Sequence, residues 1–300
     1  MAEALFETVP NFSEGRDIQK VERIARAASS VPGVRALGLH SDPDHNRSVL
    51  TLAGGEEPLL RASVELARAC ASEIDLAGAG GSGVHPRVGS LDVLPFIPLE
   101  GAEMEDAVRL ARRAGGEICA LGFAVYLYEA AASAPERRNL ADLRRGGYEG
   151  LAARTREPLW SPDYGAPDLD PRLGAVAVGA RPFLVAFNAY LDTGEVEVAR
   201  AVAREVRERD GGLLSLKALG LEVAGRAQVS MNLTDLEVTS LPAATERVRA
   251  AAAGHGARVD STELVGLLPL EAVLETARYY LGLPELRPEQ VLEYRLRLPG

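Results

Sequence analysis

Residues 84–98 read Val84-His85-Pro86-Arg87-Val88-Gly89-Ser90-Leu91-Asp92-Val93-Leu94-Pro95-Phe96-Ile97-Pro98 and join a glycine-rich loop to an apolar segment. The apolar part, residues 93–97, is short and bounded by proline, which predicts a buried β-strand. The part before it places an imidazole, a guanidinium and a carboxylate close together in the sequence. This stretch therefore supplies one strand of the fold and a cluster of reactive groups at the start of that strand.

The elements around this strand alternate in a regular order. Apolar spacing of three and four residues predicts helices, and short apolar runs rich in β-formers predict strands. The predicted order is strand 5–9, turn 11–15, helix 17–28, strands 34–39 and 48–52, helix 57–70 and strand 93–97. This βαββαβ order is typical of a ferredoxin-like unit, and a helix at 104–113 and a strand at 123–127 extend it.

The second half of the chain repeats this order. It gives strand 182–190, helix 196–207, strands 214–221 and 228–233, helix 243–251, strand 258–264 and helix 270–279. Repetition of six elements indicates a duplication. The proline-rich residues 157–172 contain the only tryptophan, which favours an ordered crossover between the halves. We therefore expect an α/β (α+β) fold of two similar ferredoxin-like subdomains, residues 1–174 and 175–300, with a ligand site in the cleft between them.

The composition limits the classes of function. The chain has 300 residues and a net charge of −10, which argues against nonspecific nucleic-acid binding because such binding relies on a cationic face. No apolar run approaches the length of a membrane-spanning helix and no signal peptide is visible, so we expect no membrane association. Cys70 and Cys119 show no metal or redox spacing and are interpreted as buried thiols, which fits a cytoplasmic protein.

His85 is the leading candidate for acid–base chemistry because an imidazole titrates near neutral pH. Pro86 restrains the backbone beside it, and Arg87 offers a donor for an anion. Asp92 could orient an imidazole N–H, cap the loop or pair with Arg87. No Ser-His or Cys-His arrangement is evident, so proton transfer by His85 is favoured over a protein nucleophile.

Two neighbouring motifs have alternative interpretations. Residues 78–83 match the pattern G-x-G-x-x-G, but they follow a predicted helix rather than a strand, so flexibility of the His85 loop is favoured over nucleotide binding. His40, Asp42, Asp44 and His45 resemble a metal site. Aspartate and proline also form turns between strands, and we expect a turn and no metal.

Several segments, in order along nearly the whole chain, resemble the formiminotransferase domain of the formiminotransferase-cyclodeaminase family. They are residues 9–15 (VPNFSEG), 46–48 (NRS), 85–93 (HPRVGSLDV), 95–98 (PFIP), 125–128 (VYLY), 144–149 (RRGGYE), 178–181 (VGAR), 186–188 (AFN), 227–233 (AQVSMNL) and 264–267 (LVGL). The chain differs from the family's pattern in the glycine-rich residues 78–84 and at His40, where well-known members carry an acid.

The resemblance implies transfer of a formimino group from N-formimino-L-glutamate to tetrahydrofolate, a step of histidine breakdown. It implies tetrahydrofolate as co-substrate, two sheets facing across a ligand tunnel, and a homodimer. The family's catalytic histidine corresponds to His85, with Arg87 and Asp92 as further catalytic candidates. The family's folate-contacting segment corresponds to Gly165, Ala166, Pro167, Asp168, Leu169, Asp170, Pro171, Arg172, Leu173 and Gly174.

Strand-end amides and arginines complete the expected binding site. The asparagines are candidate partners for the pterin or the amidine, and the arginines, with Lys217, for substrate carboxylates. These candidates are Asn11, Asn46, Arg47, Arg181, Asn188 and Asn232. Two other functions stay open: a folate-dependent transferase that uses another donor such as formylglutamate, and a non-catalytic module that binds folate or an amino acid.

Overall fold

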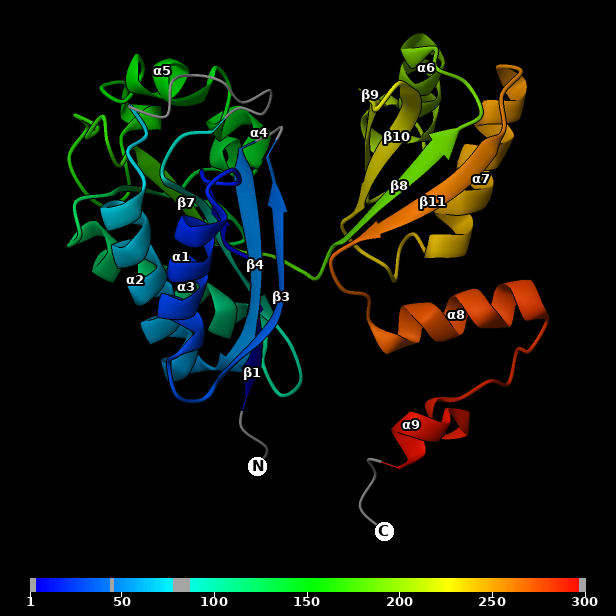
Figure 1. The fold of residues 1–300 in the computed structure, drawn as a ribbon, viewed down its shortest axis with the longest axis horizontal. Helices are drawn as coiled ribbons and strands as arrows, with labels where there is room; N and C mark the ends of the chain where they lie inside the picture. The colour runs from blue at the N-terminus through cyan, green and yellow to red at the C-terminus, as the bar shows by residue number, and fades with distance from the viewer. Residues whose placement is uncertain (1–3, 44–45, 78–86, 297–300) are drawn as a thin grey trace. The chain divides into compact units, whose positions relative to one another are not determined.

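The computed structural model describes residues 4–43, 46–77 and 87–296 and divides into two compact units, Met1–Pro182 and Phe183–Gly300 (Figure 1). Each unit has one sheet, and both belong to the mixed α/β class. The division falls eight residues after the expected boundary at residue 174. The reason is that the next strand, β7 (Ala175–Ala180), lies inside the first sheet, between β5 (Leu91–Pro98) and β6 (Ala124–Glu129).

The first sheet has seven strands in the order β1-β4-β2-β5-β7-β6, with β3 paired to β4. Both β1 and β2 lie between β4 and β5. The turn expected at residues 11–15 is wrong in part, because pairing resumes at Asn11 after Pro10 interrupts the strand. The remaining strands are β1 (Leu5–Thr8), β2 (Asn11–Phe12), β3 (Val34–Asp42) and β4 (Arg47–Gly55).

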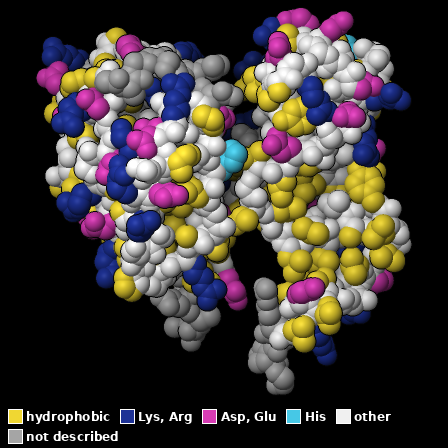
Figure 2. Space-filling model, viewed as in Figure 1, with side chains coloured by type: hydrophobic (Ala, Val, Ile, Leu, Met, Phe, Trp, Pro, Cys, Tyr) yellow, Lys and Arg dark blue, Asp and Glu magenta, His cyan; other side chains and the backbone are white. Residues whose placement is uncertain are grey.

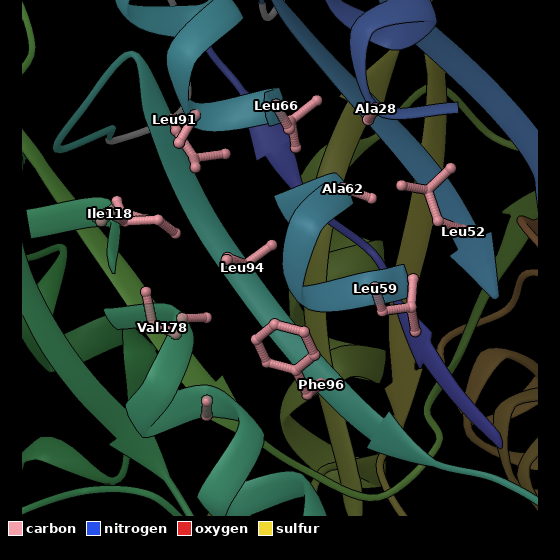
Figure 3. Close-up of a cluster of buried hydrophobic side chains, with 14 of the residues drawn as sticks. Ala28, Leu52, Leu59, Ala62, Leu66, Leu91, Leu94, Phe96, Ile118 and Val178 are labelled. Atoms are coloured by element: carbon pink, nitrogen blue, oxygen red, sulfur yellow. The ribbon is translucent and has the colours of Figure 1, made fainter. Parts of the chain in front are cut away.

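Three helices cover one face of this sheet (Figure 1). They are α1 (Ile18–Ser29), α2 (Glu56–Glu73) and α3 (Met104–Cys119). The Asp17 carboxylate caps α1 by accepting a hydrogen bond from the Lys20 amide at 3.1 Å. Figure 3 shows Leu59 and Leu66 of α2 among the buried side chains of the cluster that includes Leu94 of β5. The expected helices 17–28, 57–70 and 104–113 are confirmed, and the main core of the first unit lies beneath them.

The opposite face of the first sheet packs against short segments that follow β6. A smaller cluster there joins Val93, Tyr126 and Ala177 of the sheet to Leu143 and Leu151. These last two residues belong to α4 (Leu140–Leu143) and α5 (Gly147–Ala152). Part of this face thus lies under the segments that lead into the crossover.

The second sheet has four strands in the order β11-β8-β10-β9. If the strands are numbered from the start of each unit, β8, β9, β10 and β11 correspond to β1/β2, β3, β4 and β5. The corresponding strands follow the same spatial order in both sheets, as expected for two similar subdomains. Its core lies between the sheet and α6 and α7. The elements are β8 (Val185–Leu191), α6 (Val196–Val206), β9 (Leu216–Val223), β10 (Arg226–Leu233), α7 (Leu241–Gly254), β11 (Val259–Val265), α8 (Leu270–Leu281) and α9 (Leu292–Arg295).

The segment from α8 onward exposes many apolar side chains, and Figure 2 shows hydrophobic atoms gathered over it. Only Ala272 and Leu274 of α8 are buried. Among the described residues, no helix is both long enough and apolar enough to span a membrane. The large exposed side chains here are Leu270, Val273, Tyr279, Tyr280, Leu281, Leu283, Leu292 and Leu296.

Candidate functional site

The leading candidate His85 lies outside the described residues, as do Pro86 and residues 78–84, but the two ends of this loop are described. Both ends are bonded to the last residues of the crossover. The hydrogen bonds run from the Leu76 amide to the Arg172 carbonyl (3.0 Å), from the Ser90 amide to the Leu173 carbonyl (2.8 Å) and from the Ala175 amide to the Val88 carbonyl (2.9 Å). The crossover therefore anchors the loop that carries His85 at its base.

Two glycines allow this close approach. Gly89 and Gly174 form an isolated antiparallel bridge. Gly174 has φ +71°, in the left-handed region that favours glycine, and a Cβ there would lie 2.2 Å from the Val88 carbonyl oxygen. A Cβ on Gly89 would lie 2.0 Å from the Ala175 carbonyl oxygen. Neither position admits a side chain while the bridge is intact.

Asp92 lies at the start of β5 and is 2% exposed. Its Oδ1 atom accepts a hydrogen bond from the Val88 amide at 2.7 Å, and its Oδ2 atom pairs with the Arg144 guanidinium. Of the interpretations that the sequence left open, the structure shows a loop-capping role and pairing with Arg144 instead of Arg87. Sequence reasoning gave no role to Arg144, although it lies in one of the segments that carry the family resemblance.

Arg144 and Arg47 lie close to this carboxylate, and Arg87 precedes the residue whose amide binds it. Burial and the neighbouring Arg144 charge lower the pKa of Arg47, whereas Asp92 and Asp42 raise it. The Nη1 atom of Arg87 and the Nε atom of Arg144 are buried, and neither has a hydrogen-bond partner in the described part of the chain. This region therefore retains buried N–H donors without partners among the described residues.

Further candidates share the face of the first sheet that α1–α3 leave free. His40, Val49, Asn11 and Val93 are successive partners across β3, β4, β2 and β5, so their side chains leave the same face. Arg47 precedes Val49 by two residues on the same strand and shares that face. The sheet register therefore places Asn11, His40 and Arg47 on one surface.

Asn46 has a structural role. It is buried, adopts φ 47° in the turn between β3 and β4, and accepts a hydrogen bond from the Gly15 amide at 3.0 Å through Oδ1. Its side-chain oxygen is thus engaged within the protein.

A second polar cluster occupies the same face of the first sheet. Glu7 is 5% exposed on β1, and its partners across the sheet are Ala53 and Ile97. Burial raises the pKa of Glu7, and the positive charge of Arg181 opposes that shift. Burial also raises the pKa of Tyr128 to about 12, although the same Arg181 charge acts to lower it. Sequence reasoning selected Arg181 but missed Glu7, a single acidic residue inside the predicted strand 5–9.

The crossover is ordered, as expected. Arg137 holds it by donating to the Leu159 carbonyl at 2.7 Å, the Ser161 carbonyl at 2.6 Å and the Asp163 carboxylate at 2.9 Å. The Tyr126 hydroxyl donates to the Trp160 carbonyl at 2.8 Å. Four of the ten predicted folate-contacting residues line a pocket of about 400 Å³ within the first unit. These are Gly165, Ala166, Asp168 and Asp170, beside Cys119, Gly122, Phe123 and Ala124.

The second-unit candidates lie on the free face of the second sheet. Asn188 Nδ2 and the Tyr190 hydroxyl both donate to the same oxygen of Glu263, each at 3.1 Å. Asn232 on β10 is paired with Lys217 on β9, so these two side chains leave one face together. Glu263 and Tyr190 were missed by sequence reasoning, because only the pairing of β11 with β8 brings Glu263 to Asn188.

The structure describes only two of the four residues that resemble a metal site in the sequence. His40 and Asp42 are described, whereas Asp44 and His45 lie outside the described residues. Within the described ranges, no three or more His, Cys, Asp or Glu side chains are grouped so as to hold a metal ion.

Comparisons with known proteins cover almost all of the chain. The family model described as formiminotransferase domain, N-terminal subdomain, matches residues 5–181, and the one described as formiminotransferase domain matches residues 186–290. The chain is 41% identical to a glutamate formimidoyltransferase of Thermoplasma acidophilum, over 98% of this chain and 97% of that protein. It is 38% identical to a glutamate formimidoyltransferase of Streptococcus pyogenes, over 97% and 98% respectively.

A longer relative matches as well. The formimidoyltransferase-cyclodeaminase of Mus musculus is 38% identical over 98% of this chain and 55% of its own length. Both family models and these relatives agree with the resemblance seen in the sequence. The chain belongs to the formiminotransferase domain family.

Proposed function

We propose that this chain transfers the formimino group of N-formimino-L-glutamate to tetrahydrofolate, which yields 5-formiminotetrahydrofolate and L-glutamate. The observation that carries the proposal is the similarity over nearly the full length of both proteins to two relatives named glutamate formimidoyltransferase. Tetrahydrofolate is a co-substrate in this reaction.

The reaction requires the transfer of one proton from the tetrahydrofolate amine to the glutamate nitrogen. The N5 amine of tetrahydrofolate attacks the formimino carbon, and a tetrahedral intermediate forms. His85 takes the proton from the attacking amine and gives it to the glutamate nitrogen. The bond between the formimino carbon and that nitrogen then breaks. Such a positioned acid–base group contributes about 10²–10⁴-fold in rate, and binding two substrates together supplies more.

The other residues bind and position. Arg87 binds a carboxylate or stabilises developing charge, and Asp92 orients the His85 loop; its bond to the Val88 amide supports this. Asn11, Arg47 and Arg181 contribute from the first sheet. Asn188 and Asn232 contribute from the second, and residues 165–174 contact the folate. Asn46 is a weaker candidate because its side-chain oxygen already accepts the Gly15 amide. The tunnel between the two sheets stays a prediction.

We also propose a homodimer in the cytoplasm. The exposed apolar side chains of α8 support self-association, because large apolar patches typically mark interfaces. The free thiols of Cys70 and Cys119 suit a reducing compartment. Sedimentation equilibrium and cell fractionation test these two points.

The decisive assay supplies the purified chain with tetrahydrofolate and either N-formimino- or N-formyl-L-glutamate. We expect turnover with the formimino donor, and its absence would reject the proposal. Turnover with the formyl donor alone would favour the transferase with a different donor.

A second experiment separates catalysis from binding. We expect His85→Asn to lose about 10²–10⁴-fold in kcat while calorimetry shows folinic acid binding close to that of the wild type. A parent protein that binds folinic acid but turns over neither donor would identify a binding module.

A further inference from the structure

The base of the His85 loop contains buried donors that the protein leaves unused. Arg144 Nη2 is bonded to Asp92, but the Nε atom of the same guanidinium is buried without a partner in the described residues. The same is true of Arg87 Nη1. Burying an N–H group without a partner destabilises a protein, so such groups are rare and call for an explanation.

The segments that carry these two arginines contact each other. Asp92 binds the Arg144 side chain through one oxygen and the amide of Val88, the neighbour of Arg87, through the other. A Cβ on Gly147, close to Arg144 in the sequence, would lie 3.4 Å from the Arg87 carbonyl oxygen. The two guanidinium groups thus come from segments that pack side by side.

The charge of these arginines selects the chemistry of a ligand. Arg47 lies near both Arg144 and Asp92. The pKa of Arg47 is lowered by burial and by the charge of Arg144. A planar anion with two oxygens would satisfy several guanidinium N–H groups at once and reduce the repulsion between the arginines. A carboxylate is the group of this shape that both proposed substrates carry.

We propose that Arg87 and Arg144 together bind one carboxylate of the amino-acid donor, and that Asp92 is a positioning residue that holds Arg144 in place. The inference rests on the proposed function for the identity of that donor. The donor nitrogen must come to His85, two residues from Arg87, and it is attached to the carbon that bears the α-carboxylate. The carboxylates of folate are separated from N5 by the whole aminobenzoyl group, which favours the donor over the folate tail.

The test compares Arg87→Met and Arg144→Met with Arg145→Met as matched control. Arg145 neighbours Arg144, but its side chain is 75% exposed and pairs with Asp142 at the surface. We expect KM for N-formimino-L-glutamate to rise roughly 10- to 100-fold in the first two variants. KM for tetrahydrofolate and all parameters of Arg145→Met should stay within about twofold of the wild type. A rise in KM for tetrahydrofolate instead of the donor would overturn the proposal.

Truncated donors identify the carboxylate. N-formimino-4-aminobutyrate lacks the α-carboxylate, and N-formimino-2-aminobutyrate lacks the γ-carboxylate. We expect Arg144→Met to leave the KM of one truncated donor unchanged, and that donor is the one without the bound group. Because the α-carboxylate is the group next to the donor nitrogen, we expect N-formimino-4-aminobutyrate to be the insensitive donor; the reverse result, or equal sensitivity of both donors, would overturn the proposal.

A double variant excludes a merely structural role. If Arg144 served only to neutralise Asp92, the combination Asp92→Asn with Arg144→Met would restore the wild-type KM for the donor. We expect it to restore the free energy of unfolding in part and to leave the KM raised. Restoration of KM would therefore overturn the proposal.

Calorimetry of L-glutamate binding to the full chain measures the affinity of the proposed carboxylate site in the absence of turnover. We expect Arg144→Met to weaken it by the same 10- to 100-fold. If no donor is turned over but glutamate binding depends on Arg144, the proposed reaction fails and the carboxylate site stands. If turnover is normal and glutamate binding is insensitive to Arg144, the carboxylate site fails alone.

Discussion

Replacement of Gly174 by alanine tests whether the crossover anchors the His85 loop. Gly174 has φ +71°, and the new methyl group would meet the Val88 carbonyl oxygen at 2.2 Å and the Gly89 Cα atom at 2.7 Å. Both contacts are with backbone, which cannot move aside as a flexible side chain would. The bridge between the loop base and the crossover must therefore open.

The expected loss of unfolding free energy is the sum of a backbone cost and the cost of two broken hydrogen bonds. The left-handed conformation costs an alanine about 1–2 kcal/mol. Opening the bridge removes the hydrogen bonds Ser90 N–H to Leu173 C=O and Ala175 N–H to Val88 C=O, each worth about 1 kcal/mol. We expect the free energy of unfolding to fall by about 3–4 kcal/mol in total.

Gly256 provides the matched control. Its φ is +72°, but no atom lies within 4 Å of the Cβ that an alanine would add. Gly256→Ala should therefore show the backbone cost alone, about 1–2 kcal/mol. Urea unfolding followed by circular dichroism measures both variants. Equal losses in the two variants would refute the close approach of the crossover to the loop.

The same substitution has a functional consequence. An opened bridge displaces the base of the loop that carries His85, and a displacement of about 1 Å can reduce kcat by roughly 100-fold. We expect Gly174→Ala to lose activity at temperatures where it remains folded, and Gly256→Ala to keep it. Full activity of folded Gly174→Ala would show that the crossover does not position the loop.

Two further substitutions test buried charges. Burial raises the pKa of Glu7 above 4.5 in the folded state, so the contribution of Glu7 to stability is present below pH 4.5 and is lost as the pH rises through the folded pKa. Glu7→Gln should abolish this pH-dependent loss of stability. Parallel pH profiles of the unfolding free energy for variant and wild type would contradict this expectation. Arg137→Met should cost about 3–5 kcal/mol, because it leaves the Asp163 carboxylate, whose side chain is only 11% exposed, without its cation. Urea unfolding measures this cost, and a loss below about 1 kcal/mol would show that the crossover does not depend on Arg137.

The helices and most strands could be predicted from the sequence because each buries one regular set of apolar positions. The helix predicted at 17–28 buries Val21, Ile24, Ala25 and Ala28, the residues that share one helical face. Strand β7 was missed for the opposite reason. Its residues are buried on both faces of the sheet and are mostly small, so they show neither alternation nor the β-branched enrichment of an obvious strand. The short β2 was interpreted as part of a turn, because two paired residues show no pattern of their own.

The site was predictable only where its residues are close in the sequence. Arg87 and Asp92 stand five residues apart, and their types alone suggested a joint role. The actual partner of Asp92 is Arg144, 52 residues later, on a segment that reaches the sheet only because α4 and α5 pack over Val93. No local pattern encodes that contact.

The pairing of Asp92 with Arg144 changes what the neighbouring groups can do. Asp92 accepts one amide and one guanidinium, so both of its oxygens are engaged at the base of the loop. Arg87 is then free of the partner that the sequence offered it, and its buried donor needs another. The unused guanidinium donors at the base of the loop are therefore a consequence of the fold, and they suit an anionic group.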